Sequence, residues 1–263
     1  MPITGPERRD ESPARPRNGS TPTVLLVHGA FTDASSWSGV IGELLAAGLD
    51  VVAPANPLRG LVSDAGYLAS VAEEIDGPVL LVGHSYGGAV ITVAGALAAN
   101  ILGLAYVAGF AIDEGESALN VSSGFPETLL SAALRPATFP DTDGKPITEL
   151  YIDREAFPKV FAADLPLLTA TAAAATQRPI AAAALEEKSP SAAWKSLPSW
   201  YVVATADRIV HPDAQRFMAK RAGAHTVELD GSHAIAGSRP ALIAGQIRTA
   251  AGAVRRPTVT SNR

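Results

Sequence analysis

A serine lies in a short glycine-rich segment that could carry nucleophilic chemistry. The segment reads Gly83-His84-Ser85-Tyr86-Gly87-Gly88, and it follows an apolar run over residues 78–82 and precedes a helix-like stretch over residues 89–94. A serine on a sharp strand-to-helix turn is strained and exposed, and the flanking glycines let strand and helix approach closely. Free backbone N–H groups and the helix dipole at that point favour the negative charge that develops during acyl transfer. Ser85 is therefore the predicted nucleophile.

A serine hydroxyl is a poor nucleophile at neutral pH, so it needs a general base, which is usually a histidine. The chain has five histidines. His233 follows the last predicted strand and precedes the terminal helix, so that its loop can reach back across the sheet edge, and we predict it as the base. His28 and His84 lie in tight turns where ring nitrogens usually make local hydrogen bonds. His211 and His225 are interpreted as surface or loop residues.

The histidine in turn needs a carboxylate that orients it. Asp207 comes just after a predicted strand, on the edge where Ser85 is expected, and is the leading prediction. Asp113 or Glu114, just past another predicted strand, is the alternative acid, because a carboxylate there could also reach the histidine.

Acyl transfer also requires hydrogen-bond donors for the developing oxyanion. The segment Val27-His28-Gly29-Ala30-Phe31 follows the first predicted strand, and its glycine lets the backbone turn an N–H toward a reacting carbonyl. We assign the two donors of this oxyanion hole to the backbone N–H groups of Ala30 and Tyr86, with Phe31 as the alternative to Ala30. The side chains of Phe31 and Phe110 could bind substrate, and packing is the competing interpretation for both.

These residues need a scaffold that brings distant segments together. Short apolar runs alternate with helical patterns, which predicts an α/β fold with a mostly parallel sheet and helices on both faces. The predicted strands span residues 23–27, 51–53, 79–82, 104–107, 200–204 and 226–229. The predicted helices span residues 36–47, 64–75, 86–99, 212–222 and 240–250. Parallel strands place their carboxyl ends on one edge, where the active sites of open α/β sheets lie.

A length of 263 residues suits a single α/β core, which we place in residues 23–112 and 199–252. The alternation fails over residues 113–198, and we interpret this stretch as a small helical cap inserted at the functional edge. An elaboration remote from the substrate is the alternative. Residues 1–22 are expected to form a disordered extension and residues 253–263 a flexible tail.

The amino-acid composition limits the binding partners and the cellular compartment that we expect for the protein. The formal net charge is −5 and no basic stripe occurs, so we expect neither nucleic acid nor a membrane surface as a partner. The expected partner is a small-molecule ester substrate. The uncharged run over residues 86–112 is interpreted as a buried helix and strand rather than a membrane span. No cysteine is present, and no metal-ligand spacing or nucleotide-binding glycine motif occurs. We therefore expect a cytoplasmic protein without a cofactor.

With these segments assembled, residues 22–252 resemble the α/β-hydrolase superfamily, whose triads occur in the chain order serine, acid, histidine seen here in Ser85, Asp207 and His233. Within it, residues 28–37 and the pair Ser232-His233 resemble the branch that contains plant methylesterases, hydroxynitrile lyases and bacterial esterase-like proteins. That resemblance implies a cofactor-free Ser-His-Asp site beneath a small cap.

Differences from the characteristic residues of these relatives narrow the range of reactions that the chain is expected to catalyse. The lyases of this branch use a lysine after the histidine and a threonine beside the first oxyanion turn, where this chain has Ala234 and Gly29. Ser85 also argues against the haloalkane dehalogenase relatives, whose nucleophile is aspartate, whereas haloperoxidase-like and oxygenase-like relatives share the triad. Because the first predicted strand begins at Thr23, little room is left for the opening hairpin of many members, and we expect a trimmed sheet.

The expected activity is hydrolysis of carboxylic esters of small, uncharged substrates through an acyl-enzyme on Ser85. A lactone, thioester or amide hydrolase would use the same groups, because acyl-transfer machinery constrains the carbonyl more than the leaving group. A non-catalytic ligand-binding receptor of the same fold is the alternative from another class.

Overall fold

The computed structural model describes residues 21–140 and 142–254, and a six-stranded sheet forms its centre. The strand order is β2-β1-β3-β4-β8-β9, and every neighbouring pair is parallel. The strands are β1 (Thr23–Val27), β2 (Val51–Val52), β3 (Val79–His84), β4 (Ile101–Val107), β8 (Ser199–Ala204) and β9 (His225–Leu229). All six predicted strands are confirmed, and within the described ranges no antiparallel strand joins this sheet.

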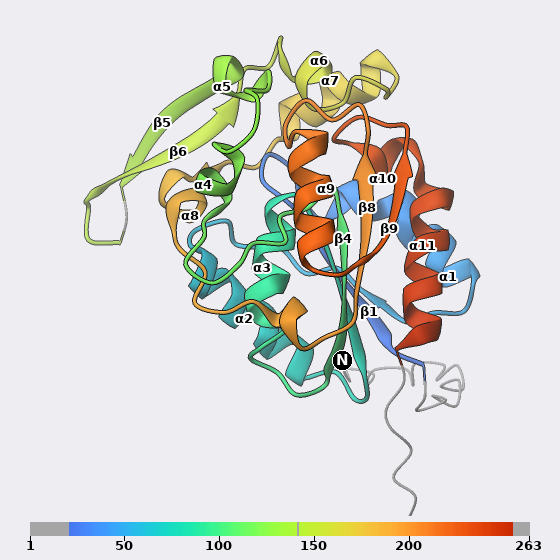
Figure 1. Ribbon diagram of the computed structural model, residues 1–263. Helices are drawn as coiled ribbons and strands as arrows, with labels where there is room; N and C mark the ends of the chain where they lie inside the picture. Colours follow the sequence, from blue (N-terminus) through green and yellow to red (C-terminus); the bar gives the residue numbers. More distant parts are fainter. Residues whose placement is uncertain (1–20, 141, 255–263) are drawn as a thin grey trace, which may run out of the picture.

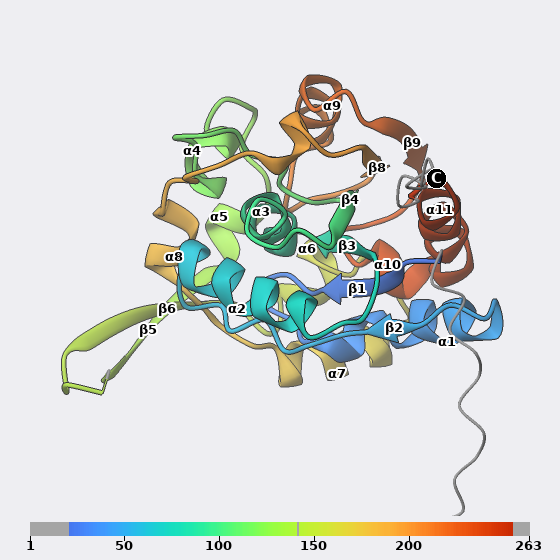
Figure 2. The same ribbon diagram turned by 90° about the horizontal axis from the view of Figure 1, so that it is seen from below.

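Helices cover both faces of the sheet, as predicted (Figure 2). One face carries α1 (Ser38–Ala46), α10 (Ile235–Ser238) and α11 (Pro240–Ala253), preceded by the short 3₁₀ helix η1 (Ala34–Trp37). The other face carries α2 (Leu61–Glu73), α3 (Tyr86–Ala94) and α9 (Pro212–Arg221). The expected N-terminal extension and C-terminal tail lie outside the described residues, except for residues 21–22 and 253–254.

The alternating direction of side chains along the central strands explains why helices cover both faces of the sheet. In β1, Val24 and Leu26 point into the apolar cluster beneath α1 and α11, whereas Leu25 and Val27 point into the cluster beneath α2 and α3. All four side chains are fully buried. Because a strand alternates its side chains between the two faces, an unbroken apolar run can be buried only between two layers of helix.

Helix α3 ends at Ala94, five residues earlier than the predicted end at Ala99. The next residue, Gly95, lies against the cap and the sheet: a β-carbon there would come within 2.8 Å of the Ala193 Cβ and 3.1 Å of a Leu104 methyl group. The chain instead makes a short turn that leads directly into β4. Helix propensity takes no account of this tertiary packing, and by itself it favours continuation of the helix through the alanines.

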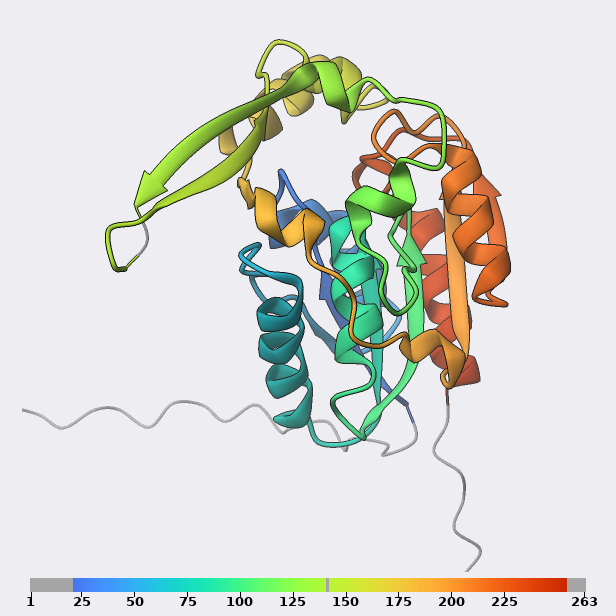
Figure 3. The same cartoon turned by 60° about the vertical axis from the view of Figure 1, so that its left-hand side comes forward.

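The cap, residues 113–198, lies between β4 and β8 and arches over the carboxyl edge of the sheet (Figures 1 and 3). Its helices are α4 (Ala118–Ser122), α5 (Leu130–Ala133), α6 (Phe157–Val160), α7 (Leu167–Thr176), α8 (Ala182–Glu186) and the 3₁₀ helix η2 (Ala193–Lys195).

The cap also contains a three-stranded antiparallel sheet, which the sequence analysis did not predict. Its strands are β5 (Leu134–Pro140), β6 (Pro146–Ile152) and β7 (Ile180–Ala181). Strand β5 holds Pro136 and Pro140, residues that argue against a strand, and most of its side chains are exposed. Such prolines are compatible with an edge strand, and β5 is an edge of this sheet.

In the described part of the chain no helix is long and apolar enough to cross a membrane. The uncharged run over residues 86–112 forms the buried α3 and β4, as interpreted from its sequence.

Glycines let α3 start directly against the strand ends. A β-carbon on Gly87 would lie 2.4 Å from the Val27 carbonyl oxygen, and one on Gly83 would lie 2.5 Å from the Gly87 carbonyl oxygen. Gly88 is equally close to the backbone after β4, where its β-carbon would lie 2.6 Å from the Phe110 nitrogen. The two glycines singled out in the sequence are therefore required by contact, and Gly88 extends the same constraint to a third strand.

Replacing Gly87 with alanine should lower the free energy of unfolding by about 3 kcal/mol, because a methyl group would have to displace strand backbone rather than a flexible side chain. Gly245→Ala is the matched control in α11, since nothing lies within 4 Å of its β-carbon position. That control should gain up to about 1 kcal/mol from helix propensity. Urea titration measures both, and a Gly87→Ala protein as stable as wild type would contradict this packing.

Candidate active site

The register of the sheet places the predicted site residues at one edge. Val27 pairs with Gly83, His84 with Val107, and Ala204 with Leu229, so that β1, β3, β4, β8 and β9 end close together. Ser85 directly follows β3, Asp207 follows β8 by three residues, and His233 follows β9 by four. The strand order also reverses between β1 and β3, and ligands of open α/β sheets bind at such a reversal.

Ser85 is in the strained turn that the sequence predicted. Its backbone has φ 54° and ψ −126°, a conformation that costs a non-glycine residue free energy and that is common at functional sites. The side chain is 4% exposed and borders a cavity. Gly29 lies directly against it, since a β-carbon on Gly29 would be 2.6 Å from the Ser85 Cβ.

His233 and Asp207 form a buried pair. The Nδ1 atom of His233 is 2.7 Å from Oδ2 of Asp207, and neither side chain is exposed. A carboxylate accepts, so Nδ1 carries the proton and Nε2 presents a lone pair. This Nε2 is buried without a hydrogen-bond partner among the described residues. A nitrogen that is both oriented by a carboxylate and left free to accept is suited to act as a general base.

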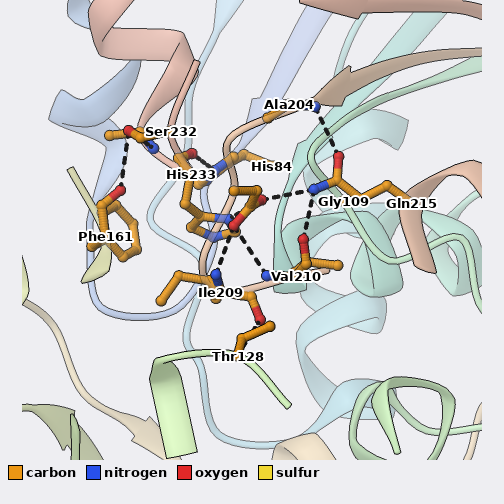
Figure 4. A network of polar contacts seen from close by, with 12 residues as sticks. His84, Gly109, Thr128, Phe161, Ala204, Ile209, Val210, Gln215, Ser232 and His233 are labelled. Atoms are coloured by element: carbon orange, nitrogen blue, oxygen red, sulfur yellow. Dashed lines mark hydrogen bonds and ion pairs between the residues drawn. The ribbon is translucent and has the colours of Figure 1, made fainter. Parts of the chain in front are cut away.

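The Asp207 carboxylate is fully satisfied by donors (Figure 4). Its Oδ1 accepts from the backbone N–H groups of Ile209, at 2.7 Å, and Val210, at 3.1 Å. Its Oδ2 accepts from Gln215 Nε2, at 2.8 Å, as well as from His233. Four donors fix the orientation of the carboxylate, and through it that of the imidazole ring.

Gln215 is the site residue that sequence reasoning missed. Its amide donates to Asp207 and to the Val210 carbonyl oxygen, at 2.8 Å each, and its Oε1 accepts from the Ala204 N–H at 3.0 Å. The side chain is completely buried on α9, next to Met218 and Ala219. A glutamine on the apolar face of an amphipathic helix was the signal that could have identified it.

His84 contacts His233 from the other side. Its Nε2 donates to the His233 carbonyl oxygen at 2.8 Å, and the two rings lie 4.6 Å apart. Burial, together with the nearby His233, lowers the pKa of His84 well below its usual range, so His84 is neutral at physiological pH. The prediction that His84 makes a hydrogen bond rather than serving as the base agrees with this contact, but the bond reaches the loop of His233 and is not local.

His28 makes the local hydrogen bond expected of it, to Gly29, and is also bonded to the more distant Asn56. Its Nε2 accepts from the Asn56 N–H at 2.9 Å, so Nδ1 carries the proton and donates to the Gly29 carbonyl oxygen at 2.9 Å. The Asn56 side chain returns a bond to the His28 carbonyl oxygen at 3.0 Å. Burial lowers the pKa of His28, which keeps the ring neutral in this role. The turn after β1 is thereby fixed against the rest of the sheet edge.

The described residues include no hydrogen bond between Ser85 Oγ and His233 Nε2. The two residues are nevertheless neighbours, because His84, which directly precedes Ser85, contacts both the ring and the backbone of His233. Hydrogen bonds of this kind are often long or poorly aligned in unliganded sites and tighten when substrate binds.

Two backbone N–H groups are free beside Ser85. The N–H of Phe31 donates to the Arg178 carbonyl oxygen at 2.9 Å and is therefore occupied, which removes Phe31 as the alternative oxyanion donor. The N–H groups of Ala30 and Tyr86 meet no acceptor among the described residues. Phe31 itself has a positive φ of 62°, so the turn that presents Ala30 is strained like that of Ser85.

A cavity of about 420 Å³ opens from Ser85 under the cap. Phe31 and Phe110, the two predicted substrate contacts, both line it, as do Ala30 and Tyr86. Most of its other walls are apolar cap side chains, among them Leu119, Phe125, Leu130, Leu134, Leu150 and Leu185. The cap thus forms a wall of the cavity that contains Ser85, and is not remote from it.

The other acids and histidines considered in the sequence analysis have different surroundings. Asp113 and Glu114 pair with Lys195, at 2.6 and 3.5 Å, so neither orients His233. His225 stacks on Trp200 at the start of β9. His211 is in a loop, as interpreted, but it lines the cavity, a position that its sequence context did not reveal. No group of three His, Asp or Glu side chains is arranged to hold a metal in the described part of the chain.

Comparisons with known proteins agree with this architecture. The model of the alpha/beta hydrolase family matches residues 24–246. No curated protein matches the sequence.

Several solved structures share the fold. A pyrethroid hydrolase from Sphingobium faniae JZ-2 has a TM-score of 0.71 at 22% identity, with 88% of this chain and 98% of that chain covered. Polyneuridine aldehyde esterase has a TM-score of 0.75 at 18% identity, with 87% and 98% covered. A methylesterase from Arabidopsis has a TM-score of 0.73 at 19% identity, with 89% and 100% covered.

Gln215→Leu should lower the free energy of unfolding by about 3 kcal/mol, because it keeps the side-chain volume but removes the bonds to the Ala204 N–H and the Val210 carbonyl oxygen and one of the four donors to the Asp207 carboxylate. Gln246→Leu, on a half-buried position of α11 whose side chain bonds to no other described residue, is the control and should change stability by less than about 0.5 kcal/mol. Chemical denaturation of both proteins measures the difference, and equal stabilities would show that the glutamine is dispensable.

Proposed function

The chain belongs to the alpha/beta hydrolase family, and from that premise we propose that it is a serine hydrolase that cleaves carboxylic esters of small, uncharged molecules. The observation that carries the proposal is the His233 imidazole, held by Asp207 at 2.7 Å with its second nitrogen buried and without a partner among the described residues, and in contact with His84, which directly precedes the strained Ser85. Two of the three similar structures described above bear esterase names, which favours an ester over another acyl compound.

In the proposed mechanism, Ser85 Oγ attacks the ester carbonyl carbon while His233 Nε2 takes the hydroxyl proton. The carbonyl oxygen becomes negatively charged and accepts hydrogen bonds from the N–H groups of Ala30 and Tyr86. The tetrahedral intermediate collapses, its bond to the alcohol oxygen breaks, and His233 returns the proton to the leaving alcohol. Asp207 stabilises the imidazolium that forms in between.

The acyl-enzyme is then hydrolysed by the same groups. His233 deprotonates a water molecule, whose oxygen attacks the acyl carbon, and the bond to Ser85 Oγ breaks as the proton returns to the serine. The acid product leaves and the enzyme is regenerated. Every proton transfer uses Nε2 of His233, so the fixed tautomer of the buried pair matters at each step.

The cavity lining supports an uncharged substrate. Its walls are mainly aliphatic and aromatic side chains, and no lysine or arginine is among the described residues that line it. The charged residues that do line it, Glu127 and Glu186, are acidic and exposed. An anionic substrate would find no counter-charge and two repelling carboxylates, whereas a neutral apolar group would gain from burial.

We expect Ser85→Ala to lower ester turnover by at least about 10⁴-fold, because no other group can form the acyl-enzyme. Initial rates on p-nitrophenyl esters from acetate to dodecanoate measure this effect, with Ser70→Ala on the exposed face of α2 as the control. The control should match wild type. Ester turnover that survives in the Ser85→Ala protein would refute the proposed nucleophile.

Substrate charge provides a second test. Kinetics on p-nitrophenyl butyrate and mono-p-nitrophenyl succinate compare acyl chains of equal length, of which only the succinate ends in a carboxylate. We expect kcat/KM to be about tenfold lower for the succinate, which corresponds to about 1.4 kcal/mol. The double variant Glu127→Gln, Glu186→Gln should narrow the gap. Equal rates for the two esters in wild type would contradict the charge preference.

A further inference from the structure

A carboxylate of the cap accepts several hydrogen bonds from the loop that carries His233. Asp164 lies between α6 and α7, and its Oδ2 accepts from the Ser232 N–H at 3.0 Å and from the Ser238 hydroxyl at 2.7 Å. Its Oδ1 accepts from the Ser232 hydroxyl. Three donors of the segment that contains His233 thus converge on one cap residue that lies about 70 positions away in the sequence.

Other contacts bring the same two segments together. The Ala234 N–H donates to the Phe161 carbonyl oxygen at 3.0 Å, and the Phe161 ring meets the His233 ring edge-on at 4.9 Å. A β-carbon on Gly231 would lie 3.3 Å from Asp164 Oδ2, so the loop has little space to approach further. The cap therefore contacts the histidine loop at residues 231 to 234 and again at Ser238.

Asp164 is suited to this contact as an anion. Partial burial by itself raises the pKa of Asp164, but hydrogen bonds from Ser232 and Ser238 outweigh it and hold the pKa below its usual range. An ionised carboxylate accepts hydrogen bonds at both oxygens and donates none, which matches the donors around it. Among the described residues no lysine or arginine forms an ion pair with Asp164, and the side-chain and backbone donors that reach it from the histidine loop belong to Ser232 and Ser238.

Three independent elements then hold His233. Asp207, after β8, fixes the ring, and His84, after β3, fixes the carbonyl oxygen of His233. Asp164 fixes the N–H and the hydroxyl of the residue just before it. The first two contacts come from the core, whereas Asp164 comes from the cap, as does the Phe161 ring that meets the His233 ring.

We propose that Asp164 is a positioning residue for His233, through which the cap sets the place of the general base relative to Ser85. The proposal rests on the proposed function, because a general base matters only if the serine reacts. It gives the cap a second role besides lining the cavity: a displacement of the segment between α6 and α7 would move the loop of His233.

The test compares Asp164→Ala with two variants of graded effect and with a matched control. Asp164→Ala removes all three acceptor contacts, and we expect kcat on p-nitrophenyl butyrate to fall by about 10- to 100-fold while KM changes less than about twofold, because the base is displaced but the cavity lining is intact. Asp164→Asn retains an oxygen for the Ser232 N–H and should recover most of kcat. Ser238→Ala removes one contact and should have a smaller effect in the same direction.

Asp153→Ala is the control. Asp153 is also a cap carboxylate that accepts backbone N–H groups, those of Glu155 and Ala156, but it contacts no residue of the histidine loop. Its kcat should match wild type. A kcat for Asp164→Ala that also matches wild type, or a loss equal to that of Asp153→Ala, would overturn the proposal, as would an effect confined to KM. If Asp164→Ala fails to fold, the kcat of Ser238→Ala decides by the same criteria.

Two further readouts separate this proposal from the proposed function. Labelling by an alkyl fluorophosphonate requires only that Ser85 Oγ bond to phosphorus, that fluoride leave and that His233 take the proton, so its rate should fall in Asp164→Ala by a factor similar to that of kcat. Hydrogen exchange should increase over residues 231–238 in Asp164→Ala but not in Asp153→Ala. If wild type neither hydrolyses esters nor reacts with the probe, the proposed function fails; the exchange measurement then decides, and unchanged protection in Asp164→Ala overturns the attachment as well.

Discussion

The close approach of α3 to the ends of the central strands is the constraint on which the site depends. Gly83 and Gly87 allow backbone to meet backbone at distances that no β-carbon tolerates, and the chain must therefore turn sharply at Ser85. The turn costs conformational free energy, which the buried strands and helices around it offset. Because the turn is fixed by packing on several sides, the serine and the N–H of Tyr86 are presented without a flexible loop.

A second level of organisation is the buried polar network around Asp207. Groups of this kind are expensive to bury unless their hydrogen bonds are satisfied, and here the carboxylate receives four. Gln215 completes that set from a helix, while His84 joins the network to the serine turn. Nε2 of His233 has no partner among the described residues, and it is the atom that the proposed chemistry needs. The hydrogen-bonding groups around Asp207 are thus paired, whereas the nitrogen that the proposed mechanism uses as the base is not.

The cap and the core are connected more closely than an insertion over an active site requires. Cap side chains form most of the apolar wall of the cavity, and the Arg178 carbonyl oxygen accepts from the N–H of Phe31, whereas the N–H of Ala30 meets no acceptor among the described residues. On the opposite side, Asp164 binds the loop of His233. The cap therefore contacts the segments that carry His233 and Ala30 as well as lining the cavity.

The sequence by itself determined the six parallel strands, the helices that cover them and the order of Ser85, Asp207 and His233, because alternation, glycine spacing and strand ends are local signals. Only the tertiary structure decided what non-local contact controls. Helix α3 ends at Ala94, where Gly95 packs against Ala193 of the cap, and β5 forms despite its prolines because it lies at a sheet edge. The carboxylate that meets His233 is that of Asp207, whereas Asp113 is paired with Lys195. Gln215 and Asp164 gain their roles only from partners brought to them by folding, and no local pattern specifies which buried acceptor or loop such a side chain will meet.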